Sequence, residues 1–426
     1  MTTTSNRAGR YLEKLLEDAS LEELLHRLEP KQSEPRTKLP RSPTITPESV
    51  AQRWDAIPAP ANCREELLDA RTAEQMARYE RNIENFIGTV KVPIGVAGPL
   101  RVNGLFAQGD YYPPLATTEA ALVASYSRGA RLITEAGGCS ALLLNEGVSR
   151  SPGFAFDNLR EAGTFVLWAV NEQERFKEVA EATTRFGKLI DMRLTVEGNH
   201  VYLIFDYTTG DAAGQNMVTI ATAAICRYIE THSPVKPRYS VLEANMSGDK
   251  KASAQSFMSV RGKKLTAEVT VAAALVEKIL HTTPERMAEH WRMSSMGGVL
   301  SGTIGVQGHY ANGLAALYLA CGQDVACVSE SAVGVTRFEV TDEGALYASV
   351  TLPNLIVGTV GGGTGLPSQR ACLDLLGLGG NGKSQAFAEV CAALALAGEL
   401  SIAGALCAGH FADAHQRLAR GTSGAR

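Results

Sequence analysis

The sequence lacks any strong excess of charge. Its 426 residues carry 41 Lys and Arg against 45 Asp and Glu, a formal net charge of −4. A protein that holds nucleic acid by bulk electrostatics needs a basic stripe, so we expect no nucleic-acid partner. A hydrophobic content of 45% can offset chain entropy, which excludes a disordered chain. The length predicts two or three domains.

The sequence also lacks a CxxC pair. Its cysteines are scattered, which excludes a zinc ribbon or a redox dithiol and predicts reduced thiols in the core, with no metal site. The eight positions are Cys63, Cys139, Cys226, Cys321, Cys327, Cys372, Cys391 and Cys407.

A long membrane-spanning run is missing as well. The N-terminus, MTTTSNRAGRYLEKLLED, has no apolar segment of a secretory signal. The longest uncharged stretch, residues 293–323, contains His309, Asn312 and many glycines. A membrane helix needs ~20 mostly apolar residues. We therefore expect a soluble, cytoplasmic protein without a membrane partner.

The first 83 residues predict a helical N-terminal region. Residues 8–29 have helical spacing, and Ser20 and Glu23 have the spacing of a capping box, so a second helix start is expected there. A proline-rich linker follows, and a third helix is predicted after Thr46, with Pro47 in its first turn.

The rest of the chain predicts an α+β fold. FVLWAV, KLIDMRLTV and HVYLIFDYT resemble strands, whereas GQNMVTIATAAICRYIETH, residues 116–134 and residues 384–418 have helical patterns. We predict a small domain at 151–241, inserted in a large catalytic domain made of residues 84–150 and 242–426.

Residues 377–384, GLGGNGKS, fit the phosphate-loop pattern GxxxxGKS and, in their first six residues, GxGxxG. Both patterns need a preceding strand, because the loop must present backbone amides to phosphate at a helix start. The preceding SQRACLDLL has a helical pattern instead, with Gly377 as a helix C-cap. A phosphate-loop NTPase is therefore kept as a weak alternative only.

Several polar or glycine-rich segments stand out among apolar surroundings. Glu119 lies at the start of an apolar helix, and Asp211 lies between a strand and a helix whose first amides can face an anion. Either carboxylate can equally be a simple helix cap. Lys250 beside Asp249 is either a solvated turn or a cationic group poised for chemistry.

Taken together and in order, these segments resemble class I 3-hydroxy-3-methylglutaryl-CoA (HMG-CoA) reductases. ENFIGTVKVPIGVAGPL at 84–100 matches ENxIG…PxGxAGPL, GDAAGQNM resembles the cofactor motif GDAMGMNM, and GTVGGGT is intact. The similarity covers about residues 80–420. It implies an inserted ferredoxin-like cofactor domain rather than a Rossmann fold, and a homodimer or higher even oligomer with active sites at the subunit interface.

The resemblance implies reduction of HMG-CoA to mevalonate and CoA with two NADPH. The motifs carry four catalytic positions over to Glu119, Lys250, Asp324 and His415. A cationic lysine suits the oxyanion formed by hydride attack, and an adjacent aspartate would raise the pKa of the lysine. A histidine near neutral pH suits protonation of the CoA thiolate, and a neutral glutamate suits protonation of the second alkoxide.

The binding residues implied by the resemblance fall into two groups. The cation pair at Arg185 and Arg420 favours NADPH over NADH. The cofactor group is Arg185, Asp211, Ala212, Gly214, Gln215, Asn216, Met217 and Arg420, and the substrate and CoA group is Ser125, Arg128, Arg150, Lys251, His309 and Asn312.

The sequence departs from the family pattern within the pocket. Glu243 stands where a serine is usual, Ser247 lies in the altered NMSGDKK segment, and Ala120 replaces a glycine. Arg292 or Met293 stands near the place of an expected pocket lysine, and Ala213 and Gln215 replace two methionines. Because a glutamate near a dicarboxyl substrate costs affinity, an enzyme that reduces a different acyl-CoA is the alternative.

Overall fold

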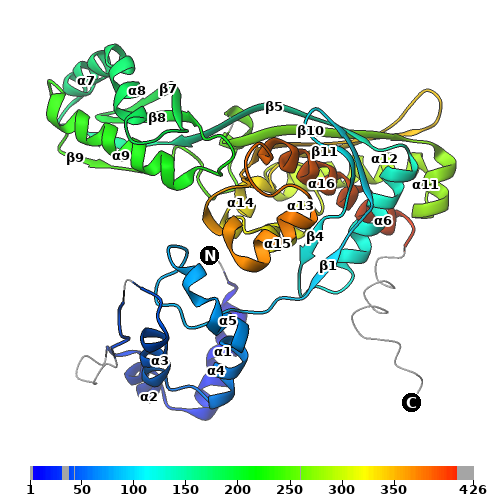
Figure 1. The fold of residues 1–426 in the computed structure, drawn as a ribbon, viewed down its shortest axis with the longest axis horizontal. Coiled ribbons are helices and arrows are strands. Elements are labelled where there is room, and N and C mark those ends of the chain that lie inside the picture. The colour runs from blue at the N-terminus through cyan, green and yellow to red at the C-terminus, as the bar shows by residue number, and fades with distance from the viewer. Residues whose placement is uncertain (1–2, 31–37, 43, 260, 410–426) are drawn as a thin grey trace. The chain divides into compact units, whose positions relative to one another are not determined.

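The protein divides into two units, residues 1–89 and 90–426, in a computed structural model that describes residues 3–30, 38–42, 44–259 and 261–409 (Figure 1). The first unit therefore ends six residues beyond the predicted boundary at 83. His410, His415 and Arg420 lie outside the described residues.

The first unit is helical, as predicted. Ser20 and Glu23 form the expected capping box at the start of the second helix, and Thr46 caps the third helix ahead of Pro47. Trp54 packs in a small core and donates from Nε1 to the Ile87 carbonyl at 2.9 Å. The elements are α1 (Ser5–Asp18), α2 (Leu21–Leu28), α3 (Pro47–Ala56), α4 (Ala61–Leu67), α5 (Ala70–Glu74) and the 3-10 helix η1 (Met76–Tyr79).

A mostly antiparallel sheet organises the second unit. Its long strand β5 (Cys139–Arg150) pairs with β10 (Gly262–Val271) and with β2 (Leu100–Gly104), and its last three residues pair with β8 (His200–Thr208). The other strands of this part are β1 (Ile94–Val96), β3 (Gln108–Tyr111), β4 (Pro114–Ala116), β11 (Val335–Val340) and β12 (Leu346–Leu355). The pairing of β2 with β5 is the parallel one between named strands of the described chain, so the sheet is not doubly wound.

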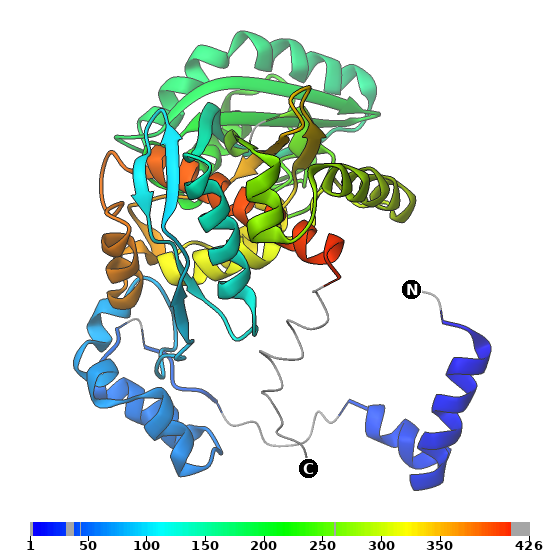
Figure 2. The same ribbon diagram turned by 90° about the vertical axis from the view of Figure 1, so that its right-hand side faces the viewer.

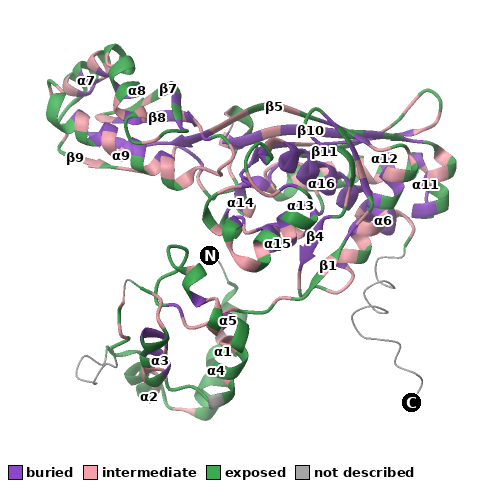
Figure 3. Ribbon diagram, in the orientation of Figure 1, coloured by how far each residue is buried: buried purple, intermediate pink, exposed green. Residues whose placement is uncertain are grey.

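The helix α16 (Ser384–Cys407) fills the core of the second unit (Figures 1 and 3). It packs on α6 (Leu122–Glu135), where a Cβ at Gly129 would overlap the Ala397 carbonyl. The missing side chain of Gly129 therefore lets the two helices approach closely. By length and composition alone α16 could cross a membrane, but 83% of its most apolar window is buried inside the protein.

The remaining helices surround this core (Figure 2). They are α10 (Gln255–Met258), α11 (Ala273–Leu280), α12 (Pro284–Ser301), α13 (Tyr310–Cys321), η2 (Val325–Cys327), α14 (Val328–Ser331), η3 (Gly362–Gly365) and α15 (Pro367–Leu375). The helix α15 occupies the place before GLGGNGKS, as predicted, and Gly377 follows it with a left-handed φ of 69°.

Residues 153–241 form a lobe with its own apolar core at one end of the unit. The order along the chain is β6 (Gly153–Ala155), α7 (Leu159–Asn171), α8 (Gln173–Glu181), β7 (Lys188–Glu197), β8 (His200–Thr208), α9 (Gln215–His232) and β9 (Tyr239–Val241). The strands pair antiparallel in the order β7-β8-β6-β9. This is the βαββαβ order of a ferredoxin-like fold.

Two expectations from local pattern were wrong. FVLWAV is the end of α7, because Asn158 caps that helix and Ala162, Phe165 and Ala169 bury one helical face. Glu119 does not begin α6, because Ala121 has a left-handed φ of 71° and the helix starts at Leu122. The predicted 384–418 helix ends at Cys407 within the described residues.

Candidate active site

Lys250 and Asp324 form the centre of the candidate site. Lys250 Nζ lies 2.7 Å from Asp324 Oδ2, although the two residues come from separate loops. The hydrogen bond to Asp324 raises the pKa of the Lys250 amine, against the opposing effect of partial burial. The lysine is therefore held as a cation with its carboxylate partner, the arrangement that the sequence predicts.

The aspartate is held in place by the start of η2. Its Oδ1 accepts from the Ala326 N–H at 3.1 Å, which leaves Oδ2 for the lysine. From the same short helix, Cys327 Sγ accepts from Gln215 Nε2 at 2.7 Å. Gln215 belongs to the predicted cofactor loop, so a direct contact joins this loop to the Asp324 segment.

Glu119 lies in a second polar group. Asn312 Nδ2 donates to both carboxylate oxygens of Glu119, at 2.9 and 3.2 Å. His309 is buried nearby and stacks on Tyr126 at a centroid distance of 4.9 Å. Burial lowers the pKa of His309, and the charge of Glu119 partly opposes this shift. In the described part of the chain, no hydrogen bond or ion pair joins this group to the Lys250 pair.

Glu399, a buried residue of α16, holds the backbone of His309 from the core side. Its carboxylate is buried and accepts from the Gly308 N–H at 3.0 Å, the His309 N–H at 2.5 Å and Thr336 Oγ1 at 2.7 Å. Burial raises the pKa of Glu399. Sequence reasoning missed this residue, although a glutamate inside an otherwise apolar helix was the available signal.

Arg150 is already paired with protein carboxylates. Its NH1 lies 2.8 Å from Asp249 Oδ2 and 3.4 Å from Glu243 Oε2, and the side chain is 8% exposed. Glu243 also accepts from Ser247 Oγ at 2.9 Å, so two positions that depart from the family pattern contact each other. The charge of Glu243 is thus largely compensated within the protein.

Asp211 does not cap the helix that follows it. Its carboxylate accepts from the N–H groups of Gly382, Lys383 and Ser384, at 2.7 to 3.1 Å, at the start of α16. Burial raises the pKa of Asp211, but these amides outweigh it and leave the pKa below its usual value. The amides that a phosphate loop would offer to a nucleotide are therefore occupied by a protein carboxylate, which counts against the NTPase reading.

The start of α9 is left open by this arrangement. No side chain caps α9 at Gly214, whose φ is 78° and where a Cβ would overlap Thr209. Thr184 Oγ1 donates to Met217 Sδ at 3.0 Å, so the segment with the exposed Arg185 lies beside the first turn of α9. The structure thus places the segment that carries Arg185 beside an uncapped helix N-terminus, and such a terminus is a suitable place for phosphate.

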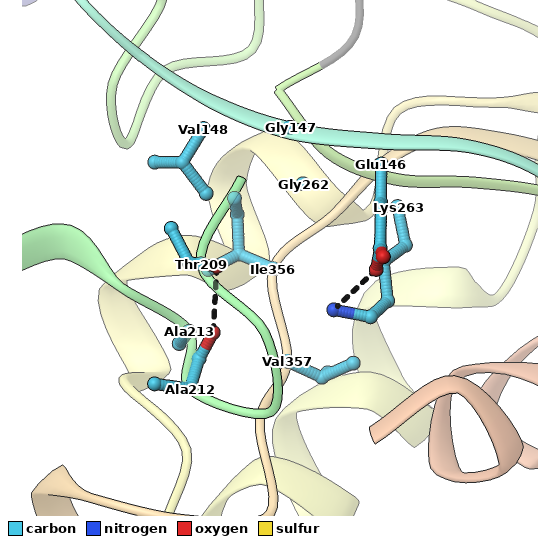
Figure 4. A pocket seen from close by; sticks show the side chains of 10 residues that line it. All are labelled: Glu146, Gly147, Val148, Thr209, Ala212, Ala213, Gly262, Lys263, Ile356 and Val357. Atoms are coloured by element: carbon cyan, nitrogen blue, oxygen red, sulfur yellow. Dashed lines mark hydrogen bonds and ion pairs between the residues drawn. The ribbon is translucent and has the colours of Figure 1, made fainter. Parts of the chain in front are cut away.

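A small pocket of about 10 Å³ lies beneath the cofactor loop, lined by Thr209, Ala212, Ala213 and the buried Lys263 (Figure 4). Thr209 Oγ1 donates to the Ala212 carbonyl at 2.8 Å, and Lys263 Nζ lies 3.4 Å from Glu146. Burial lowers the pKa of Lys263, whereas Glu146 raises it. The pocket has room for about one water, so it braces the loop rather than holding a dinucleotide.

Of the remaining predicted binding residues, three contact α16 or the Lys250 loop. Ser125 Oγ lies 2.9 Å from Ser401 Oγ, and Arg128 NH2 donates to the Ser401 carbonyl at 2.8 Å, so both lean on α16. Lys251 Nζ donates to the Asp249 carbonyl at 2.8 Å, and Asn216 is exposed.

No group of three or more His, Cys, Asp or Glu side chains that could hold a metal ion occurs among the described residues. All eight cysteines are unpaired, and five of them are buried. A cationic lysine held by a carboxylate, joined through Gln215 and Cys327 to the predicted cofactor loop, agrees with an oxidoreductase.

Comparison with known proteins gives the family. The family described as hydroxymethylglutaryl-coenzyme A reductase matches residues 49–420. A reductase of this name from Pyrococcus horikoshii is 45% identical over 80% of this chain and 84% of its own. The one from Methanothermobacter thermautotrophicus is 43% identical over 88% of this chain and 94% of its own. This chain therefore belongs to the HMG-CoA reductase family.

A solved structure has the same fold. A reductase of this name from Streptococcus pneumoniae matches with a TM-score of 0.64 at 20% identity, over 92% of this chain and 98% of its own. A class II enzyme of that organism, solved with NADPH, matches with a TM-score of 0.63 at 20% identity, over 81% of this chain and 84% of its own. At 20% identity these two matches show that the fold is shared.

Proposed function

We propose that this chain reduces 3-hydroxy-3-methylglutaryl-CoA to mevalonate and free CoA, with two NADPH as hydride donors. The single observation that carries the proposal is the Lys250–Asp324 pair at 2.7 Å, in a chain of this family. Each hydride delivers two electrons to the acyl carbon. The thioester thus passes through a hemithioacetal and an aldehyde to the alcohol.

Lys250 stabilises the oxyanion that forms on the thioester oxygen. A cation aimed at developing charge lowers the barrier more than it strengthens ground-state binding. Asp324 keeps the amine protonated and orients it, which agrees with the raised pKa of Lys250. Glu119, held by Asn312, is the proposed source of the proton for the second alkoxide. His415 protonates the departing CoA thiolate.

NADPH binds at the start of α9. The uncapped N-terminus of that helix meets the pyrophosphate, and Arg185 receives the 2′-phosphate together with Arg420. The rest of the cofactor would lie along the loop made of Ala212, Gly214, Gln215, Asn216 and Met217. Asp211 serves this loop by anchoring it to α16.

The competing proposal is that the enzyme reduces a different acyl-CoA in place of HMG-CoA. The observation that favours it is the pairing of Arg150 with Glu243, since this arginine is the predicted partner of the substrate carboxylate. The deciding experiment follows NADPH oxidation by the purified chain with a panel of acyl-CoAs. Highest kcat/KM with HMG-CoA supports the first proposal. No turnover of HMG-CoA, with turnover of an acyl-CoA that lacks the carboxylate, would replace it.

We further propose a cytoplasmic homodimer, or a higher even oligomer, with active sites at the subunit interface. The support is an exposed apolar face on α12, with Met293 78% and Leu300 81% exposed. Eight unpaired cysteines suit a reducing compartment.

A further inference from the structure

A chain of alternating charges lies beneath the loop that carries Lys250. Glu330 Oε2 lies 2.8 Å from Arg261 Nε, Arg261 NH2 contacts Asp249, and Asp249 contacts Arg150. Glu330 is fully buried and the Arg261 side chain is 1% exposed. None of the proposed chemical steps uses Glu330 or Arg261. Such a buried network is costly unless each member keeps its partner.

One member of this charge network makes a hydrogen bond to Lys250. Glu330 Oε1 accepts from the Lys250 N–H at 3.0 Å. At this residue the backbone has a left-handed φ of 54°, a conformation that is uncommon for residues other than glycine. A strained backbone persists only where its surroundings hold it. Two contacts hold it here: the Glu330 carboxylate accepts from its N–H, and the Lys251 N–H donates to the Gly248 carbonyl at 3.1 Å across the same turn.

We propose that Glu330 is a positioning residue for the reduction: its buried carboxylate holds the Lys250 backbone in the conformation that directs Nζ to Asp324. Arg261 fixes Glu330 from the other side and ties it to Asp249, the residue before Lys250. The inference rests on the proposed function for its kinetic consequence. The position of the lysine can be tested without it.

Protonation of Glu330 should loosen this hold. Burial raises the pKa of Glu330 to about 7, against the lowering effects of Arg261 and of the Lys250 N–H. The titratable groups that face it are Arg261 and Asp249, together with Cys327 and Tyr318. As the pH falls through 7 the carboxylate becomes neutral, and kcat should fall with it.

The kinetic test compares Glu330→Ala and Glu330→Gln with the wild type. The alanine variant loses the acceptor, and we expect kcat to fall about 100-fold, as small misplacements of catalytic groups do. The glutamine variant keeps an acceptor oxygen without charge, so kcat should fall ~10-fold and its acid limb near pH 7 should disappear. KM for HMG-CoA and NADPH should change less than about 2-fold in both variants, since only the transition-state interaction is weakened.

Glu389→Gln is the matched control. Glu389 is equally buried and accepts from the N–H groups of residues 105–107, and the proposed mechanism does not involve it. We expect Glu389→Gln to lower the melting temperature about as much as the Glu330 variants do, but to leave kcat unchanged. This outcome would show that the loss of kcat in the Glu330 variants does not come from reduced stability. If both Glu330 variants keep wild-type kcat, or lose no more than the control at equal melting temperature, the proposal is wrong.

A second readout does not need turnover. Reductive ¹³C-methylation followed by NMR titration reports the pKa of Lys250, assigned with Lys250→Arg. Because Asp324 raises this pKa, we expect it to fall in Glu330→Ala as the pair separates. If the wild type does not reduce HMG-CoA but this pKa falls, the proposed function fails and the positioning role stands. If the pKa is unchanged in both variants, the positioning role fails.

Discussion

At the scale of single residues, the site depends on charges that are held rather than free. Lys250 has Asp324, Glu119 has Asn312, and Arg150 has Asp249. Preorganised charges cost no reorganisation when the transition state forms. The kinetic consequences of substitutions at these residues should therefore appear in kcat before they appear in binding.

Lys250→Ala should reduce kcat about 10²- to 10³-fold and leave binding of CoA and NADPH nearly intact, because the cation acts mainly on the developing oxyanion. Steady-state kinetics and equilibrium binding check this. Lys278→Ala, which removes an exposed lysine 3.1 Å from Glu135, is the control and should leave kcat unchanged. Wild-type turnover in Lys250→Ala would disprove the role.

His415→Gln should slow the release of CoA from the hemithioacetal more than the reduction of free mevaldehyde, because only the first step needs a proton on the thiolate. His415 lies outside the described residues, so this role comes from the motif alone. Measured rates for HMG-CoA and for mevaldehyde separate the two steps. Equal slowing of both would contradict the assignment.

At the scale of elements, Asp211 joins the cofactor loop to the core helix α16. Sequence reasoning placed Asp211 in the cofactor site, and the segment 377–384 resembled a phosphate loop. The structure unites the two observations, because the carboxylate occupies the amides that begin α16. A sequence pattern could not reveal this, since the partners are 171 to 173 residues apart.

Asp211→Asn should lower stability by about 0.3–1 kcal/mol, the usual value of a negative charge at a helix N-terminus, since asparagine still offers an acceptor oxygen, and it should raise KM for NADPH. The folded pKa of Asp211 is depressed, so its contribution is present above about pH 4 and is lost in stronger acid. Thermal melts of wild type and variant should converge as the pH falls below the depressed pKa of Asp211.

Asn158→Ala, which removes the cap of α7, is the matched control for this prediction. It should cost similar stability with an unchanged KM for NADPH, because α7 does not carry the cofactor loop. If Asp211→Asn also left the KM for NADPH unchanged, the hydrogen bonds between Asp211 and the start of α16 would not organise the cofactor site.

At the scale of the whole molecule, the exposed face of α12 gives a test of assembly. Met293, Met296, Val299 and Leu300 are 60–81% exposed. Leu300→Glu should place a charge in the proposed interface and convert a dimer, of twice 45.4 kDa, to a monomer with loss of activity. Light scattering and turnover check both effects.

Leu167→Glu on α7 is the control for the assembly prediction, since Leu167 is 71% exposed but lies on the small lobe. It should change neither mass nor turnover. A fully active wild-type monomer of about 45 kDa would rule out the dimer.

Local sequence pattern was sufficient for the helical first unit and the α+β class, because caps and periodicity act over a few residues, whereas the ferredoxin-like lobe was predicted through the family resemblance. The prediction of a strand at FVLWAV was wrong, because these β-branched and aromatic residues belong to a helix that Asn158 caps. The sequence placed Lys250 and Asp324 in one site through their motifs, although no local pattern shows that two loops meet. That they lie 2.7 Å apart was decided by packing.

Sequence thus determined which residues can do the chemistry, because side-chain type sets charge and proton affinity. Only the tertiary structure decided how these groups are partnered. The pairing of Arg150 with Asp249 and Glu243, the hydrogen bonds of Asp211 to the start of α16 and the hydrogen bond of Glu330 to the Lys250 N–H all join residues at least 80 positions apart. Such pairs arise because burial forces every charge to find a partner wherever the fold brings one.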